Sequence, residues 1–177
     1  MQKKLDNLFR KLEQSRYDLL HLTEGYSEQQ LNFKPEDGQW SMAQVIKHLA
    51  LTETQILQYV QRRIEKGSLQ EANYKSWIRY MLVKLVLRYK KKIKAPRQVA
   101  SPPNEVNSIE VKKEWETLRV QWKNTLELMQ PEQVSKNIFR HPMAGDMSIS
   151  HTLGFMDEHV RHHMAQIKRI RGSGNWN

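Results

Sequence analysis

Apolar residues recur every three or four positions along most of the chain, which is the spacing of amphipathic helices. The first such stretch predicts a helix from about the N-terminus to Glu24, ended by Gly25. A second stretch predicts a helix that begins after Ser41 and continues to Lys66. Ser41 and Gln44 have the three-residue spacing of a capping box, which marks a helix start.

Two further helices are predicted in the C-terminal half. An apolar stripe runs over 111–129 and stops before Pro131, and another helix runs from Ser148 to the region of Gly172. A loop over 141–145 separates them, and no stretch shows sustained strand alternation between turn residues. The sequence therefore predicts an all-α protein, a four-helix bundle forming a single domain over 1–177.

One segment holds nearly all of the excess positive charge. The chain has 29 Lys and Arg against 19 Asp and Glu, a net charge of +10, yet no acidic residue lies between Glu71 and Glu105. That interval contains nine cations: Lys75, Arg79, Lys84, Arg88, Lys90, Lys91, Lys92, Lys94 and Arg97. Since 10 − 9 = 1, the remainder of the chain is almost neutral.

Apolar residues within this basic segment, 75–97, recur every four positions, from Trp77 through Met81, Leu85 and Tyr89 to Ile93. This spacing predicts an additional basic helix inserted between helices two and three of the bundle. Its ordinary interpretation is a packed helix with a solvated face. The alternative is a face that binds an anionic partner or nucleic acid.

Cysteine is absent from the chain, so any metal must be held by histidine or oxygen ligands and any thiol must arrive with a substrate. The N-terminus lacks the continuous apolar stretch of a signal peptide, and no later apolar run reaches membrane-spanning length. We therefore expect a cytoplasmic protein with no membrane partner.

The histidines are unevenly placed. Three of the seven fall within five residues, and His159 and His163, four residues apart, share one face of the last predicted helix. His48 borders the apolar stripe of helix two, so all three imidazoles are expected to point into the bundle. Three neutral imidazoles can hold a divalent ion and leave a fourth position open. The alternative for each histidine is a hydrogen-bonded core residue.

Neighbouring polar residues have weaker assignments. Gln166 could position a bound water or substrate group, and His162, which projects about 100° from His163, is expected at the rim of the site. Three acidic residues near the histidines carry no assignment as general acid or base: Glu53, Asp157 and Glu158. Three other histidines are expected to be structural or surface residues: His21, His141 and His151. No catalytic residue is assigned.

Three motifs occur in order over most of the chain: WSMAQVIKHL, KAPRQVASP and FRHPMAGDMSISHTLGFMDEHVRHHMAQIKRI. Through them the sequence resembles the DinB-like superfamily of four-helix-bundle metalloproteins. The resemblance implies that His48, His159 and His163 hold a divalent ion, zinc or nickel in most members. It also implies activation of a thiol or water by that ion. Members with known activity include thiol S-transferases and thiol-dependent isomerases, and many others are described as metal-dependent hydrolases.

Three hypotheses follow. The first is a metal-dependent enzyme acting on a small molecule, with S-transfer from a low-molecular-weight thiol as the leading reaction and hydrolysis as the alternative. The second is a non-enzymatic protein that binds nucleic acid through the basic helix, although nucleic acid is not the expected partner. The third is a scaffold bundle with a vestigial site. A homodimer is compatible with each of them.

Overall fold

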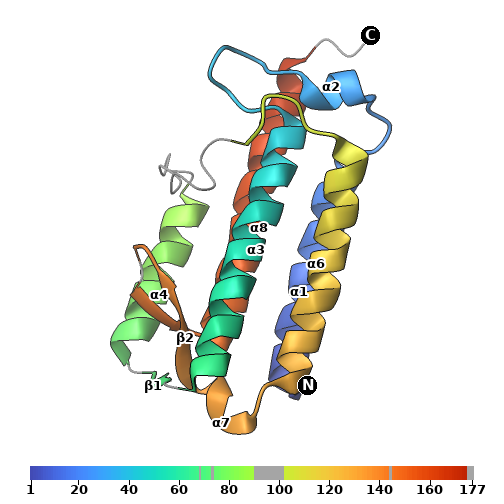
Figure 1. The fold of residues 1–177 in the computed structure, drawn as a ribbon. Helices are drawn as coiled ribbons and strands as arrows, with labels where there is room; N and C mark the ends of the chain where they lie inside the picture. Colours follow the sequence, from blue (N-terminus) through green and yellow to red (C-terminus); the bar gives the residue numbers. More distant parts are fainter. Residues whose placement is uncertain (68, 73, 90–101, 144, 175–177) are drawn as a thin grey trace.

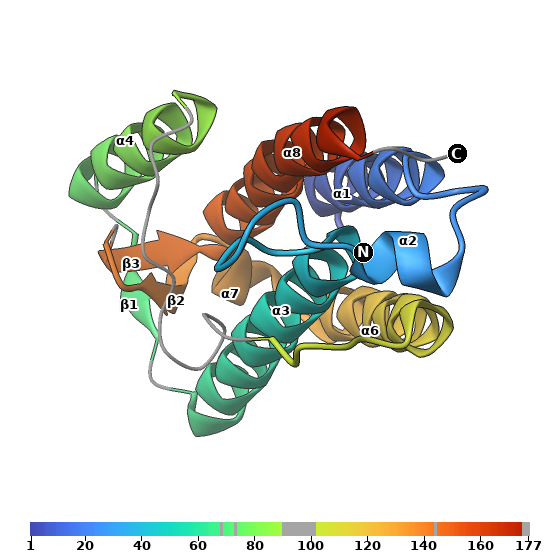
Figure 2. The ribbon, with the colours of Figure 1, turned by 90° about the horizontal axis from the view of Figure 1, so that it is seen from above.

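Four long helices form the body of the computed structural model, which describes residues 1–67, 69–72, 74–89, 102–143 and 145–174. They are α1 (Lys3–His21), α3 (Met42–Lys66), α6 (Ser108–Leu128) and α8 (Ile149–Ser173). Seen from above, they occupy the four corners of a bundle, in which α8 lies beside both α1 and α3 (Figure 2). Helices α1 and α8 run in one direction and α3 and α6 in the other (Figure 1). The expected four-helix bundle is confirmed.

The apolar stripes of these helices meet in a single core. Its largest fully buried side chains include Trp115, Trp122, Leu5, Leu12, Leu19, Met42, Ile46 and Leu49. Full burial of one aliphatic or aromatic side chain contributes roughly 1.5–3 kcal/mol, so packing of these faces outweighs the local preference of any single helix.

The helix ends follow local sequence signals. The Ser41 Oγ accepts the Gln44 N–H at 3.1 Å, and the Gln44 Oε1 accepts the Ser41 N–H at 3.0 Å, which is the expected capping box. Gly67 ends α3 with a φ of +67°. Helix α1 ends at His21, three residues before the expected end at Glu24. The short helix α2 (Glu28–Asn32) was not expected.

A small antiparallel sheet corrects the expectation of a chain without strands. It contains β1 (Gln70–Glu71), β2 (Lys136–His141) and β3 (Gly145–Ser148), in the order β1-β2-β3. The region expected as a loop is thus the end of a hairpin. Each strand has only two to six residues, and the register shifts between Asn137 and Phe139, so no long alternation marks the hairpin in the sequence.

Helix α4 (Tyr74–Arg88) lies outside the four-helix bundle and packs against α8 and β3 (Figure 1). A Cβ added at Gly154 would lie 2.3 Å from the Tyr80 hydroxyl, so the absence of a side chain on α8 permits this close approach. The expected basic segment extends to residue 97, and its part beyond residue 89 lies outside the described residues. A four-residue helix, α7 (Pro131–Val134), precedes the hairpin. Among the described helices, none has the length and apolarity needed to cross a bilayer.

Candidate metal centre

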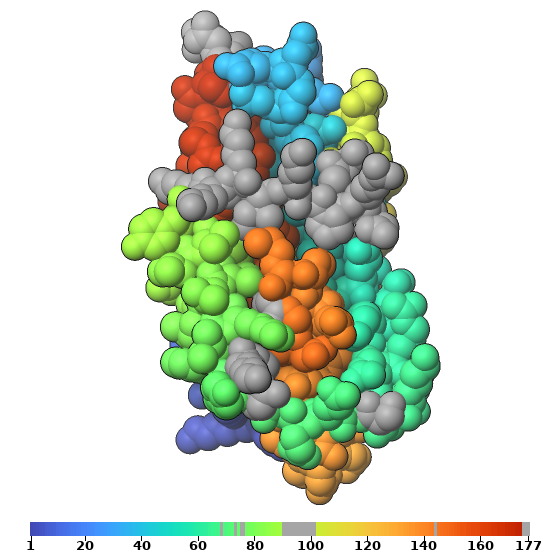
Figure 3. Space-filling model, turned by 90° about the vertical axis from the view of Figure 1, so that its left-hand side faces the viewer, coloured from blue at the N-terminus to red at the C-terminus, as the bar shows by residue number. Residues whose placement is uncertain are grey.

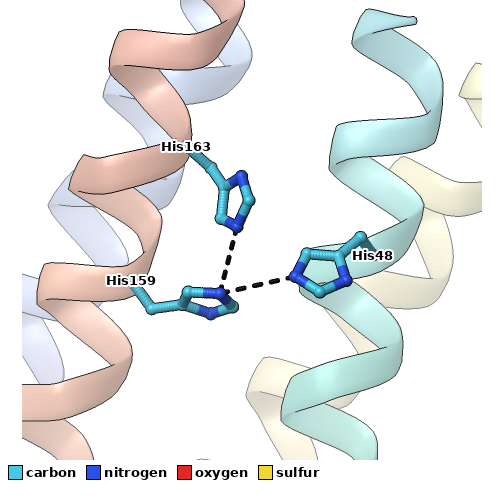
Figure 4. Close-up of side chains that lie close together, drawn as sticks. All are labelled: His48, His159 and His163. Atoms are coloured by element: carbon cyan, nitrogen blue, oxygen red, sulfur yellow. Dashed lines mark hydrogen bonds between the residues drawn. The ribbon is translucent and has the colours of Figure 1, made fainter. Parts of the chain in front are cut away.

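The structure brings together the three histidines singled out in the sequence. His48 projects from the second turn of α3, and His159 and His163 project towards it from successive turns of α8 (Figure 4). The Nε2 of His159 lies 3.4 Å from the Nε2 of His48 and 3.1 Å from the Nε2 of His163. One ring nitrogen from each residue thus falls within 4.8 Å of the other two.

Burial keeps the two imidazoles of α8 neutral. Desolvation, reinforced by the neighbouring histidines, holds the pKa of His159 well below its usual 6.5. Desolvation is also the main cause that lowers the pKa of His163, to about 3. Neutral imidazole is the form that binds metal, so the ring nitrogens carry lone pairs ready for a cation at neutral pH.

Gln166 fixes the orientation of His163. The Nδ1–H of His163 donates to the Gln166 Oε1 at 2.8 Å, which leaves the lone pair of Nε2 facing the other two rings. This hydrogen bond is a different contact from the water or substrate contact expected for Gln166. Trp40 packs beside the cluster, with its ring 4.9 Å from that of His48 and 6.4 Å from that of His163.

His162 lies beside the cluster and contacts α4. Its Nδ1–H donates to the Leu87 carbonyl at 2.8 Å, and its ring centre is 5.2 Å from that of His163. Because α4 ends at Arg88, the Leu87 carbonyl belongs to the last turn, where carbonyls lack partners within the helix. His162 therefore links the end of α4 to the helix that carries two of the clustered imidazoles.

A cavity of about 1150 Å³ opens onto the three imidazoles. Its walls come from α3, α4, β2, α8 and the segment before α3, and its apolar lining includes Trp40, Ile56, Val83, Leu87, Phe139 and Phe155. Three arginines lie on its walls, Arg62, Arg140 and Arg169, and Glu36 is the one carboxylate among the described lining residues. The cavity is large enough for a small organic molecule.

His141 also lines this cavity, contrary to the expectation of a structural or surface residue. It lies at the end of β2, and its Nδ1 accepts the Met143 N–H at 3.1 Å. Burial lowers its pKa to about 4. Its ring packs 4.6 Å from Phe155, which stacks on His159 at 5.6 Å. The β2–β3 hairpin brings His141 to the cavity. Because the hairpin was not predicted, no signal in the sequence indicated that His141 lines the site.

The three unassigned acidic residues lie in other networks. Glu53 is buried in an ion pair with Arg119. Glu158 pairs with Lys84 and Arg88 on α4, and Asp157 accepts a hydrogen bond from the Ser15 hydroxyl of α1. None of the three lines the cavity, so they are not candidates for proton transfer at the cluster.

The donor set fits a divalent ion. Two nitrogens bound to one tetrahedral Zn²⁺, each about 2.1 Å from it, lie about 3.4 Å apart. The two short Nε2 separations match this distance closely. Three imidazoles at an open cavity, two of them buried and one half-buried, with an oxygen acceptor behind His163, form the arrangement of metal sites that keep a position for an exchangeable ligand.

Comparisons with known proteins show which proteins this chain is similar to. Two bacterial proteins align along most of their length: the uncharacterized YuaE of Bacillus subtilis and a protein of Bacillus mycoides named "putative metal-dependent hydrolase". YuaE is 20% identical over 89% of this chain and 93% of its own. The second protein is 22% identical over 97% of this chain and 88% of its own.

One solved structure and one family profile also match the chain. YfiT of Bacillus subtilis, described as "a probable metal-dependent hydrolase with an unusual four-helix bundle topology", superposes with a TM-score of 0.56 and 19% identity. The alignment covers all of this chain and 91% of YfiT, and it supports the fold. The profile of the DinB superfamily matches residues 11–167. The chain therefore belongs to the DinB superfamily.

Proposed function

We propose that the chain is a metal-dependent enzyme that hydrolyses a small-molecule substrate, with His48, His159 and His163 as the ligands of one divalent ion. The observation that carries this proposal is the convergence of three imidazole nitrogens, within 4.8 Å of one another, on a cavity of about 1150 Å³. Zinc and nickel are the ions we propose, because imidazole suits both.

Each protein group has a physical role in this scheme. A divalent ion, when bound by three imidazoles, lowers the pKa of a bound water or thiol and supplies a nucleophile near neutral pH. Gln166 holds His163 in the tautomer that offers Nε2. The indole of Trp40 and the ring of Phe155 cover the imidazoles and limit the access of bulk water.

Hydrolysis is placed ahead of thiol transfer because two of the similar proteins, the Bacillus mycoides protein and YfiT, are described as metal-dependent hydrolases. Transfer of a low-molecular-weight thiol, the leading expectation from the sequence, stays a prediction, and it requires the thiol to come from a substrate because the chain has no cysteine. The two reactions use the same ion and differ in the nucleophile that occupies its open position.

Metal content tests the ligands first. Protein purified without an affinity tag is expected to carry about one divalent ion per chain, and His48→Ala and His159→Ala to carry less than about a tenth as much, since each removes one of three ligands. His21→Ala is the matched control, because His21 is exposed at the end of α1. Unchanged metal content in both cluster variants would rule out the site.

Activity tests the reaction. Metal-loaded protein is assayed against a panel of esters and amides, and separately against an electrophile with a low-molecular-weight thiol. Hydrolysis that falls by about 100-fold or more in His159→Ala and is unchanged in His21→Ala supports the proposal. Turnover in the thiol assay alone would replace hydrolysis with thiol transfer. No turnover in either assay by metal-loaded protein would favour a scaffold.

A further inference from the structure

The cavity beside the imidazoles carries an excess of positive charge. Three of its described lining residues are arginines, Arg62 of α3, Arg140 of β2 and Arg169 of α8, and Glu36 is the one carboxylate among them. The Glu36 carboxylate accepts a hydrogen bond from the side-chain amide of Gln39 at 2.5 Å. Among the residues that the structure describes, none forms a salt bridge with these three arginines. The described lining therefore offers cations to a ligand and few anions.

The arginines come from elements that surround the cavity. Figure 3 shows α4, the β2–β3 hairpin and α3 side by side on one face of the molecule, with the end of α8 and the segment before α3 above them. Arg62, Arg140 and Arg169 are all exposed, so they are accessible to a ligand that enters the cavity. Asp146 is the register partner of Arg140 across the hairpin, but the two side chains form no salt bridge.

The side chain of Arg169 folds back towards the imidazoles. Arg169 lies six residues after His163 on α8, and its Nη1 donates to the Ala165 carbonyl at 3.3 Å. The guanidinium thus lies beside the turn that follows His163, as expected for a helical side chain, which leans towards the N-terminus of its helix. Its charge is also one of the causes that lower the pKa of His163. The positive group of Arg169 is therefore close to the clustered ring nitrogens.

Most donors of Arg169 are open to a ligand. A guanidinium has five N–H donors in a planar fork, which fits a carboxylate or a phosphate with two parallel hydrogen bonds. The one hydrogen bond to the Ala165 carbonyl uses a single nitrogen. With a divalent ion at the imidazoles, positive charge on this side of the cavity would increase further, and repulsion between the charges favours a ligand that brings a negative group.

A neutral substrate is the alternative, with water alone solvating the arginines. Arginines from three separate elements lie on one cavity, and the single carboxylate of the described lining is hydrogen-bonded to a neighbour, which favours an anion. The lining also has apolar side chains, including Ile56, Val83 and Phe139, so the ligand can have an apolar body beside its charged group.

We propose that the substrate of this site is anionic: an ester or amide that also carries a carboxylate or phosphate group. The Arg169 guanidinium binds that group while the ester or amide bond lies beside the imidazoles, and Arg62 and Arg140 add positive charge to the same cavity. This inference rests on the proposed function and adds the substrate class to it. Hydrolysis adds one water molecule across the ester or amide bond, releases an acid and an alcohol or amine, and leaves the distal anionic group unchanged.

Direct binding tests the inference without turnover. Zinc-loaded protein is titrated by calorimetry with three anilides of matched length: glutaranilic acid, which ends in a carboxylate, phosphonobutyranilide, which ends in a phosphonate, and valeranilide, which ends in a methyl group. A charged anilide is expected to bind about tenfold or more tightly than valeranilide, because charge-assisted hydrogen bonds with arginine stabilise only the anion. The tighter of the two charged anilides distinguishes a carboxylate substrate from a phosphate substrate. Equal affinity for charged and neutral anilides, or no binding of any of the three, overturns the inference.

Two variants on α8 test the role of Arg169. Arg169→Met removes the guanidinium, and Lys168→Met, the matched control, removes the same charge from an exposed neighbour that does not line the cavity. The preference for the charged anilide is expected to fall about tenfold in Arg169→Met and to stay within about twofold of wild type in Lys168→Met. Circular dichroism checks that both variants keep their helices. An equal fall in both variants, or no fall in Arg169→Met, contradicts binding of the anion by Arg169.

Removal of the ion separates this inference from the proposed function. His159→Ala is expected to lose the ion and hydrolysis but to keep the preference for the charged anilide, because Arg169 is intact. A preference that is lost in His159→Ala and kept in Arg169→Met would mean that the anion binds the ion directly, which overturns the inference.

Turnover is compared with phenyl hydrogen glutarate and phenyl valerate, which differ only in the charged end group. The KM of zinc-loaded protein for the charged ester is expected to be about tenfold lower. A charge preference in anilide binding without hydrolysis of either ester would contradict the proposed reaction and leave the anion site standing. Hydrolysis of both esters with equal KM would support the reaction and overturn the anionic substrate.

Discussion

Helix α3 contributes to two polar clusters that differ in their charges. Glu53 faces α6, where its carboxylate accepts hydrogen bonds from the Arg119 guanidinium at 2.8 Å and the Trp115 Nε1–H at 2.9 Å. Five residues earlier and about 140° around the helix, His48 faces α8 and meets His159 and His163. The first cluster is a compensated ion pair, whereas the second contains three imidazoles and no acid.

The difference supports the three-His cluster, and not the ion pair, as the proposed ligand site. In the Glu53–Arg119 cluster the carboxylate is paired with an opposite charge, and neither residue lines the cavity beside the imidazoles. In the three-His cluster three ring nitrogens converge beside an open cavity. Ring nitrogens of neutral imidazoles that lie this close together can bind one cation jointly.

Breaking the compensated cluster is expected to have the largest effect on stability. Arg119→Met leaves Glu53 buried without its partner and should lower the free energy of unfolding by about 3–5 kcal/mol. Denaturant titration measures this change. The control is Lys47→Met, which breaks the more exposed pair with Glu114 at the same α3–α6 interface and should cost at most about 1 kcal/mol. Equal effects of the two substitutions would remove the distinction between the pairs.

Adding metal is expected to stabilise the other cluster. Zn²⁺ at about 100 times its dissociation constant should raise the free energy of unfolding by about 2.7 kcal/mol. His159→Ala should lose this increment, and Arg119→Met should keep it despite its lower starting stability. Thermal or denaturant unfolding with and without Zn²⁺ provides the measurement. An equal increment in His159→Ala would place the ion elsewhere.

Acid is expected to weaken the metal-free protein through its imidazoles. The pKa values of His159 and His163 lie below 6.5 when folded, so the unfolded chain binds more protons and stability falls as the pH drops below 6.5 towards about 3. By about pH 5.8 the two imidazoles together should cost about 2 kcal/mol. Denaturant titrations across this range test the slope. The double variant His159→Phe/His163→Phe should be flatter, and an unchanged slope would contradict the assignment.

The smallest expected effect comes from removing the hydrogen bond that orients the His163 ring. Gln166→Leu removes the acceptor behind His163 and should weaken zinc binding about tenfold, equivalent to about 1.4 kcal/mol. Gln166→Glu restores an acceptor and should bind at least as tightly as wild type. Competition with a chromogenic chelator measures both. Equal affinity in Gln166→Leu and wild type would mean that packing alone orients His163.

The parts of the fold that could be predicted have local causes. The capping box of Ser41 and Gln44 lies within four residues, and the four-residue spacing of His159 and His163 places both on one face of any helix. His48 could be predicted because it borders an apolar stripe that faces inward. These features survive in the structure because bundle packing reinforces what each segment already favours.

The missed features depend on contacts between distant segments. Glu53 and Arg119 are 66 residues apart, and neither residue alone signals an ion pair. His141 reaches the cavity only because β2 pairs with β3 and packs on α3, where the Phe139 ring meets Tyr59 at 5.5 Å. Strands of four to six residues are stabilised by this packing and not by their own propensity, so periodicity in the sequence could not reveal them.

The separation of the clustered imidazoles along the chain has a consequence for synthesis on the ribosome. His48 and His159 are 111 residues apart, and two of the three rings belong to α8. At elongation rates of about 5–20 residues per second, several seconds pass between the emergence of α3 and that of α8. During that interval the nascent chain contains only one of the three proposed ligands, His48. If these histidines hold the ion as proposed, binding of metal would report that the last helix has docked.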